Sequence, residues 1–409
     1  MSWRRSRTAV VTAGLVLGGF VLVGAASPAS SAPREAGSCG PLVNVSHRGA
    51  GGIAPENTRA AMALAGSSGG DVFEVDVQLS EDSKVVIMHD TNLARTTNVE
   101  TVFPGREADP INTFTLAELR QLDAGTWWDS RFAGERIPTL ADVLDYAEPS
   151  GVGVYLELKD PALNPGLIEA IDVEMDADAR WSGLIQAGRV TFSSFDASEL
   201  KQAKQLRPTV PVVWVSSLPA SDATLAEAAT WADTYGTHYR TLGAGDVDRI
   251  KSHGLQALLY TLDSPEALTE GIALGADAII TDFPNVLTAV CNGTDPFPDS
   301  TGIEITSVVA NPSGDDLQPE NGEHMVLTNT TGATVNVSNY YVHDAVANKL
   351  RVGSGYTIAP GAQLRVYTGP GTNTATRYYN GGSKNVLNNT GDSLSVFTPT
   401  HLLTDVFGY

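Results

Sequence analysis

Residues 73–90 read FEVDVQLSEDSKVVIMHD. Glu74 and Asp76 interrupt a run of β-branched and aromatic residues that otherwise predicts a strand. Successive side chains of a strand point to opposite faces, so these two carboxylates, two positions apart, share one face. A plain hydrophobic strand would not be expected to carry two acids on one face.

The residues after this acidic run predict a hairpin. Residues 80–83, SEDS, are turn-forming, and they separate the run from KVVIMH. If Leu79 pairs with Lys84, the antiparallel register places Glu74 opposite His89. Two carboxylates and an imidazole would then converge.

Strand and helix patterns alternate over about 250 residues on either side of this hairpin. Amphipathic stretches such as NTRAAMALAGS, TLADVLDYAE, DASELKQAKQL and SPEALTEGIALG lie between many of the apolar runs. This alternation predicts an α/β fold, a TIM-type (β/α)8 barrel over residues 39–291. The expected strands are residues 42–46, 71–77, 84–89, 152–159, 189–195, 210–217, 255–262 and 277–283.

The composition and hydrophobic pattern of the sequence change after the barrel region. Residues 292–301 are a linker rich in Pro, Gly and Asp. Residues 302–409 alternate apolar and polar positions between turn signals and show almost no helix pattern. We expect a second domain there, a small immunoglobulin-like all-β sandwich.

The first 32 residues predict a signal peptide. MSWRRSRT is basic, AVVTAGLVLGGFVLVGAA is apolar, and SPASSA offers the small residues that a signal peptidase accepts. The protein is therefore expected to be secreted and extracellular. Arg4-Arg5 leaves a twin-arginine route as a second choice. A retained membrane anchor is the other interpretation, and the small residues argue against it.

Two cysteines, Cys39 and Cys291, bracket the barrel region. In an exported protein such a pair predicts a disulfide. The formal net charge of −21 argues against a nucleic-acid partner, because phosphate backbones are bound by clustered Lys and Arg.

More polar residues follow other predicted strands, at the ends where barrels hold their chemistry. His47 and Arg48 follow residues 42–46, while Glu157 and Lys159 end residues 152–159. With Glu74 and Asp76, Glu157 makes three carboxylates without a thiolate, a set suited to Ca²⁺ or Mg²⁺.

Such a cation beside Arg and Lys would hold an anion, and phosphate is the natural candidate. His47 and His89 could act as acid and base. Taken singly, each acid could be a solvated strand residue and each histidine a structural one. The convergence of all of them on predicted strand ends favours a site.

With these residues in view, the sequence resembles the glycerophosphodiester phosphodiesterase family from about Val43 to Pro284. The resemblance rests on SHRGAGGIAPENTRAAMALA, FEVDVQLSEDSKVVIMHDTNLARTT, IPTLADVL, YLELK and GADAIITDFP. It implies a TIM-type barrel and a reaction in which a glycerol hydroxyl attacks phosphorus and water then opens the cyclic phosphate to glycerol 3-phosphate. It also implies roles for site residues: a divalent cation held by Glu74, Asp76 and Glu157, acid/base work by His47 and His89, and phosphate contacts from Arg48 and Lys159.

One departure bears on the substrate. The segment that often reads WTVN in the family is YTLD here, Tyr260 to Asp263, so the wall facing the substrate is altered. Tyr260 is a candidate substrate contact, and Trp214 is another, with a core position as its alternative.

Three functions stay open at this point. The leading one is hydrolysis of small glycerophosphodiesters such as glycerophosphocholine or glycerophosphoethanolamine. A lysophospholipase D-type enzyme acting on lysophospholipids is the second. A surface-binding protein with an inactive barrel is the third, although its expected signature, a lost acid or histidine, is absent.

The C-terminal region resembles a lamin-tail domain. The resemblance lies in NGEHMVLTNTTGATVNVSNYYVHDA, IAPGAQLRVYTG and LNNTGDSLSVF. It implies an immunoglobulin-like sandwich with a binding or spacing role toward an unidentified surface or partner.

Overall fold

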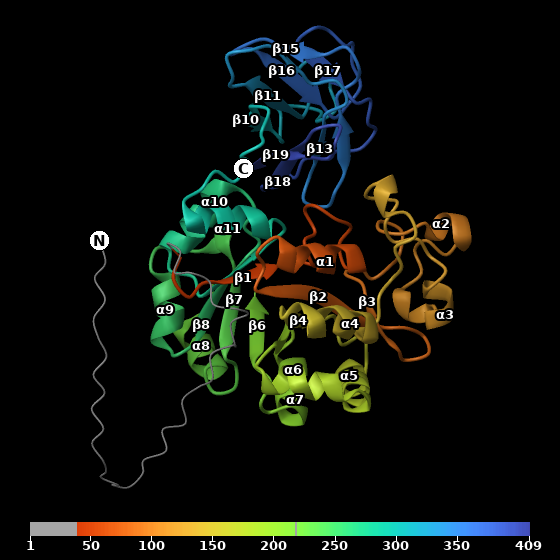
Figure 1. The fold of residues 1–409 in the computed structure, drawn as a ribbon, viewed down its shortest axis with the longest axis vertical. Helices are drawn as coiled ribbons and strands as arrows, with labels where there is room; N and C mark the ends of the chain where they lie inside the picture. The colour runs from red at the N-terminus through yellow and green to blue at the C-terminus, as the bar shows by residue number, and fades with distance from the viewer. Residues whose placement is uncertain (1–38, 217–218) are drawn as a thin grey trace, which may run out of the picture.

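The computed structural model describes residues 39–216 and 219–409. The predicted signal peptide, residues 1–32, lies outside these residues. Figure 1 shows the two folded parts, a barrel and a sandwich that sits above it. None of the helices that the structure describes is long and apolar enough to cross a membrane.

Eight parallel strands form a closed barrel, which confirms the predicted TIM-type fold. Strand β1 pairs with both β2 and β9, and the other strands follow in the order β4, β5, β6, β7 and β8. The bounds are β1 Val43–Ser46, β2 Val72–Leu79, β4 Gly153–Leu158, β5 Val190–Ser194, β6 Val212–Ser216, β7 Thr234–His238, β8 Gln256–Tyr260 and β9 Ala278–Thr281.

Strand β7, with the sequence TYGTH, is not among the strands predicted from the sequence. It contains no run of apolar residues, which is why its sequence gives no strand signal. Gly236 lies at its centre, and a Cβ there would come within 3.2 Å of the Leu258 side chain. The predicted amphipathic stretches do form helices, shown around the barrel in Figure 1. The longer ones are α1 Arg59–Ser67, α4 Leu140–Ser150, α5 Leu167–Ala177, α6 Ala179–Gln186, α7 Ala197–Leu206, α8 Asp222–Ala228, α9 Asp246–Ser252, α10 Pro265–Ala273 and α11 Pro284–Asn292.

Alternation along β2 separates the two faces of the barrel wall. Phe73, Val75 and Val77 pack outward against residues of the surrounding helices, whereas Val72 belongs to the inner cluster. Glu74 and Asp76 share the face of Val72, so the sequence pattern correctly aims both carboxylates into the barrel.

The hairpin register differs from the expected one by a residue. Strand β3, Val85–Ile87, runs antiparallel to β2, and Leu79 pairs with Val85 rather than with Lys84. The turn takes five residues because Ser83 adopts a positive φ of 55° and the Ser80 N–H bonds to the Lys84 carbonyl. Glu74 therefore does not lie opposite His89. His89 follows the end of β3 instead.

A lobe with its own small core is inserted between β3 and α4. It contains the short helices α2 Val99–Val102 and α3 Leu116–Leu119 and packs around Phe114 and Ile111. The lobe brings Trp127 and Trp128 to the side of the barrel mouth.

The C-terminal domain is all β, as predicted. Its two four-stranded sheets share one apolar core, consistent with an immunoglobulin-like sandwich. One sheet has the order β10 Ile303–Val309, β11 His324–Asn329, β16 Gln363–Tyr367, β17 Arg377–Tyr379; the other has β14 Lys349–Arg351, β13 Tyr341–His343, β18 Ser393–Phe397, β19 Leu403–Gly408; β12 Val335–Asn336 and β15 Thr357–Ile358 form a separate pair.

The predicted disulfide is present. Cys39 and Cys291 form an S–S bond across 252 residues of sequence. It ties the segment before β1 to the end of α11 and so joins the two ends of the barrel region.

Candidate active site

Three carboxylates meet inside the barrel, at the carboxyl ends of two neighbouring strands. Asp76 on β2 lies beside Glu157 on β4 in the parallel register, and Glu74 shares the face of Asp76. One oxygen from each of the three lies within 4.8 Å of the others. Glu74 and Asp76 are buried, with 2% and 1% of their surface exposed.

Two cationic side chains border this cluster. The Lys159 Nζ lies 2.7 Å from Glu157 Oε1 and 3.1 Å from Asp76 Oδ1. The Arg48 backbone N–H donates to Glu74 Oε2 at 2.7 Å, and its guanidinium pairs with Glu56 at 2.9 Å. Arg48 adopts a φ of 52°, which turns the chain so that both its backbone and its side chain face the carboxylates.

The carboxylates differ in electrostatic environment. Burial raises the pKa of Glu74 to about 8, and the charge of Asp76 adds to that rise. Burial also works against ionised Asp76, but Lys159, His89 and Arg48 outweigh it and hold the pKa of Asp76 well below its ordinary value.

The donor set fits a hard cation. Glu74 Oε1 is buried and has no hydrogen-bond partner among the described residues. An orphaned carboxylate oxygen beside two more carboxylates is the environment that Ca²⁺ or Mg²⁺ would satisfy.

Each predicted histidine has a carboxylate partner. His47 Nδ1 and Asp282 Oδ1 lie 2.8 Å apart, and so do His89 Nδ1 and Asp90 Oδ1. Burial lowers the pKa of His47, but the charge of Asp282 outweighs it and raises that pKa to about 9. A pKa of about 9 makes His47 an imidazolium at neutral pH, and Asp282 occupies its Nδ1.

One cavity of about 220 Å³ brings the predicted residues together. Its lining contains eight of them: His47, Arg48, Glu74, Asp76, His89, Glu157, Lys159 and Tyr260. The Tyr260 hydroxyl donates to the Ser216 carbonyl at 2.6 Å, which holds the ring beside Phe195.

The structure contradicts the prediction that Trp214 contacts the substrate. Its neighbours Val213 and Val215 line the cavity, so Trp214 points to the opposite face of β6. There its ring packs against Trp231 and Tyr235, both 5.6 Å away. The alternation of the strand rules out the substrate contact that was expected of Trp214.

Arg95 links two acids beside the site, Glu56 and Asp90, that were not predicted as site residues. Arg95 bonds both oxygens of Glu56, at 2.6 and 2.7 Å, and both oxygens of Asp90, at 2.7 and 2.9 Å. Glu56, His89 and Asp90 also come close enough together to suggest a metal site. Arg48 also pairs with Glu56, so two guanidinium groups balance the charges of Glu56 and Asp90, and Asp90 Oδ1 lies 2.8 Å from His89 Nδ1.

Asp282 and His238 could have been found from their position. Each stands at or just after the carboxyl end of a strand, β9 and β7 respectively. In a barrel that position is the signal for a functional residue. His238 lines the cavity, and its Nδ1 has no partner among the described residues.

The barrel geometry agrees with comparisons to known proteins. The model of the glycerophosphoryl diester phosphodiesterase family matches residues 47–286, and the lamin tail domain model matches residues 297–409. The chain belongs to the glycerophosphoryl diester phosphodiesterase family.

Individual relatives align with the barrel region of this phosphodiesterase. A glycerophosphodiester phosphodiesterase of Bacillus subtilis is 30% identical over 264 residues, 62% of this chain and 87% of the relative. Another from Caldanaerobacter subterraneus is 32% identical over 250 residues, 59% of this chain and 95% of the relative. The structure of an Oleispira antarctica phosphodiesterase with its product sn-glycerol-3-phosphate is similar with a TM-score of 0.53 and 31% identity, over 61% of this chain and 96% of that one.

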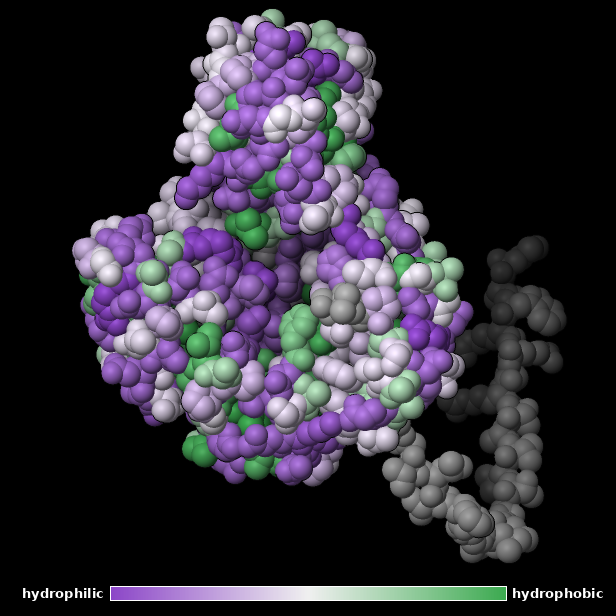
Figure 2. Space-filling view, turned by 180° about the vertical axis from the view of Figure 1, so that it is seen from behind, coloured by the Kyte–Doolittle hydropathy of each residue, from purple (hydrophilic) through white to green (hydrophobic). Residues whose placement is uncertain are grey.

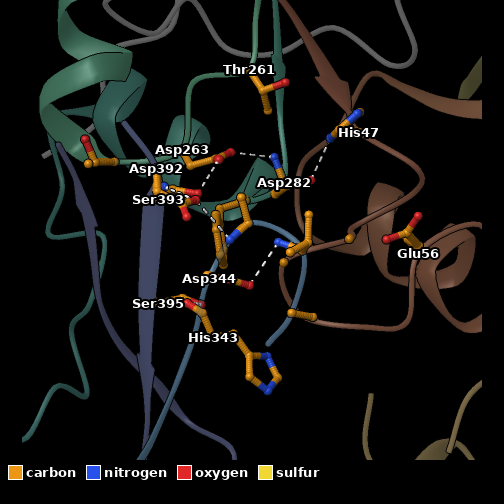
Figure 3. Close-up of a pocket in the computed structure, with 18 of the residues that line it drawn as sticks. His47, Glu56, Thr261, Asp263, Asp282, His343, Asp344, Asp392, Ser393 and Ser395 are labelled. Atoms are coloured by element: carbon orange, nitrogen blue, oxygen red, sulfur yellow. Dashed lines mark hydrogen bonds and ion pairs between the residues drawn. The ribbon is translucent and has the colours of Figure 1, made fainter. Parts of the chain in front are cut away.

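The YTLD segment, Tyr260 to Asp263, contacts the sandwich domain. Asp263, its last residue, accepts a hydrogen bond from the Ser393 hydroxyl at 2.9 Å and one from the Asp282 backbone N–H at 2.8 Å. Figure 3 shows this chain from Ser393 through Asp263 and Asp282 to His47. Burial raises the pKa of Asp263 to about 7, and the charge of Asp282 adds to that rise.

Proposed function

We propose that this chain is a secreted, metal-dependent phosphoric diester hydrolase that cleaves glycerophosphodiesters to glycerol 3-phosphate and an alcohol. One observation carries the proposal: a single cavity gathers three carboxylates, His47, His89, Arg48 and Lys159. The Oleispira antarctica relative binds sn-glycerol-3-phosphate as its product, which supports the same product here.

Glu74, Asp76 and Glu157 would hold the divalent cation. Their oxygens are close enough to share one ion, and Glu74 Oε1 is free to accept it. The cation would supply positive charge that polarises a phosphoryl oxygen. Both Ca²⁺ and Mg²⁺ take oxygen ligands, so the metal-dependence is proposed for either.

Lys159 and Arg48 are the proposed phosphate contacts. Lys159 has three N–H donors, and its two carboxylate contacts leave one for a phosphoryl oxygen. Arg48 Nε is buried, lies 3.6 Å from Asp76 Oδ2 and makes no hydrogen bond among the described residues. Both groups would neutralise phosphate charge beside the carboxylates.

His47 is the proposed proton donor to the leaving alcohol. Asp282 keeps it protonated at neutral pH and fixes the ring through Nδ1. His89 would then take the proton of the attacking hydroxyl, with its ring oriented by Asp90 and Arg95.

Export is supported by the disulfide between Cys39 and Cys291, because such bonds persist in oxidising compartments. The expected signal peptide agrees with this. A cytosolic location would leave the pair reduced.

A lysophospholipase D-type activity is the second candidate. Phe195 lies at the cavity beside Tyr260 and keeps 53% of its surface exposed. An exposed aromatic side chain at the entrance could lie against an acyl chain.

A substrate comparison separates the two candidates. The protein is incubated with glycerophosphocholine or lysophosphatidylcholine and a divalent cation, and released glycerol 3-phosphate, lysophosphatidic acid and choline are measured. We expect glycerol 3-phosphate from the first and at least tenfold slower choline release from the second. Choline release from the lipid alone would replace the first proposal with the second.

A further inference from the structure

A second cavity, of about 260 Å³, lies between the barrel and the sandwich. It shares His47, Arg48, His238 and Thr261 with the cavity of the proposed active site. A phosphate held at His47 and Arg48 would therefore stand where the two cavities meet. Figure 2 shows the surface hollowed where the sandwich meets the barrel, bordered largely by hydrophilic residues.

The sandwich supplies the outer wall of this cavity. The wall consists of the segment Asp344–Ala347, between β13 and β14, together with Asn388 and residues 391–393. Asp344 Oδ1 accepts from the N–H groups of Val346 and Asn348, at 3.1 and 2.7 Å. Asp392 Oδ1 accepts from the Ala345 N–H at 3.2 Å, so the wall has a defined shape.

Contacts between the domains fix this wall above the barrel mouth. Besides the Ser393 bond to Asp263, the Arg240 guanidinium donates to the Tyr409 carbonyl at 2.5 Å and to the Asp392 carbonyl at 3.3 Å. On the other side Lys349 donates to the Trp128 carbonyl at 2.9 Å. A wall tied to the barrel at three points can discriminate by size.

The lining carries more negative than positive charge. Its carboxylates are Glu56, Asp263, Asp282, Asp344 and Asp392, and its cationic groups are Arg48, Arg240 and the His47 imidazolium, five acids against three cations. Glu56 pairs with arginines and Asp282 with His47. Asp263, Asp344 and Asp392 form no side-chain ion pair within the described parts of the chain, and Figure 3 draws all three around one pocket.

A phosphodiester carries two alcohol groups, here called its arms, one on each side of the phosphate. Two cavities meet at the proposed phosphate position, so each can hold one arm. One arm of the proposed substrate is always glycerol, which is neutral, whereas the other varies and can carry charge. An excess of buried carboxylates is stabilised by a cation and gains nothing from a neutral group. The interdomain cavity therefore matches the variable arm.

We propose that the interdomain cavity is the subsite for the alcohol arm of the diester, that the sandwich forms its outer wall, and that it favours a small cationic alcohol over a neutral one. This inference rests on the proposed function. It gives the C-terminal domain a part in substrate selection.

Three esters of glycerol 3-phosphate test the subsite: the methyl, glycerol and ethanolamine esters. In the wild-type protein we expect the KM of the ethanolamine ester to be about fivefold below that of the glycerol ester. Asp392→Asn keeps an oxygen for the Ala345 N–H and removes the charge, so it should bring the two KM values within twofold. Asp299→Asn, an exposed acid in the linker, is the matched control and should leave the ratio unchanged.

Ala345→Trp tests the wall by filling the cavity from the sandwich side. We expect the KM of the ethanolamine and glycerol esters to rise at least tenfold and that of the methyl ester to change less than twofold. Ala333→Trp, at an exposed position of the sandwich away from the cavity, is the steric control. Thermal melting of each variant shows whether it is folded.

The outcomes separate the two proposals. If the wild type cleaves all three esters and neither Asp392→Asn nor Ala345→Trp changes their relative KM values, the subsite is refuted while the proposed function stands. An equal loss on all three esters in a folded Ala345→Trp variant also refutes it. If the wild type cleaves none of them, the proposed function fails, and the subsite fails with it.

Discussion

Ser393 of the sandwich donates a 2.9 Å hydrogen bond to Asp263 of the barrel, and the other oxygen of Asp263 accepts from the Asp282 backbone. Asp282 in turn holds His47. A residue from the added domain thus helps to position the carboxylate beside the proposed proton donor. Asp263 ends the YTLD segment, so this segment of the barrel mouth carries a contact to the sandwich.

Removing the hydroxyl of Ser393 should loosen this chain. We expect Ser393→Ala to lower kcat about threefold to tenfold with KM within twofold, because small displacements of a catalytic group slow the reaction. Ser393→Thr keeps the hydroxyl and should restore kcat. Steady-state kinetics check both, and Ser300→Ala, which removes a hydroxyl that bonds the Thr404 carbonyl, is the matched control. Equal kcat values for Ser393→Ala and wild type would show that the bond is dispensable.

Glu74 should be required for cation binding. EDTA is expected to abolish activity, and Ca²⁺ or Mg²⁺ to restore it; Glu74→Gln should lose at least about 100-fold in kcat/KM. Binding also stabilises the folded state, by about 2.7 kcal/mol at a hundred times the Kd, so the cation should raise the melting temperature of wild type but not of Glu74→Gln. Glu81→Gln, at the exposed hairpin tip, should behave like wild type.

Without the cation, Glu74→Gln should be more stable than wild type at alkaline pH, the reverse of the order expected with the cation bound. The folded-state pKa of Glu74 is raised from 4.5 to about 8, so stability falls as pH rises between these values and the penalty is complete above about pH 8. Glu74→Gln removes this penalty and should melt higher than wild type at pH 9 with EDTA present. A lower melting temperature for the variant would contradict the electrostatic account of this carboxylate.

The pH profile should report the Asp282 and His47 pair. As the proposed donor, His47 must be protonated, and its pKa is raised to about 9, so kcat/KM should fall as pH rises through about 9. Asp282→Asn removes the main cause of the rise, and the fall should move toward 6.5, the ordinary value. Asp248→Asn, an exposed acid on α9, should leave the profile in place. An unshifted profile in Asp282→Asn would assign the alkaline fall to another group.

Local patterns predicted the barrel wall well. Alternation along β2 and β4 correctly placed Glu74, Asp76 and Glu157 on the inner face, because one face of each strand packs on helices. Strand β7 escaped prediction because TYGTH has no apolar run and is identified only by its pairing with β6 and β8. The hairpin register depended on the positive φ of Ser83, which the residue type does not predict.

The partners of the site residues could not be read from the chain in the same way. His47 and Asp282 are 235 positions apart, and Ser393 and Asp263 are 130 apart and in different domains. Such pairs form only when the barrel closes and the sandwich docks. Composition and periodicity describe neighbours within one element, so they carry no signal of these contacts.

The central claim is tested most directly by the release of glycerol 3-phosphate from glycerophosphoethanolamine, with a divalent cation present, by wild type and His47→Ala. We predict turnover by wild type and at least about a 100-fold lower rate in His47→Ala, the loss expected when a general acid is removed. The variant should melt with wild-type cooperativity and keep the stabilisation by the cation. No release of glycerol 3-phosphate by wild type, or a rate within twofold of it in His47→Ala, would contradict the account.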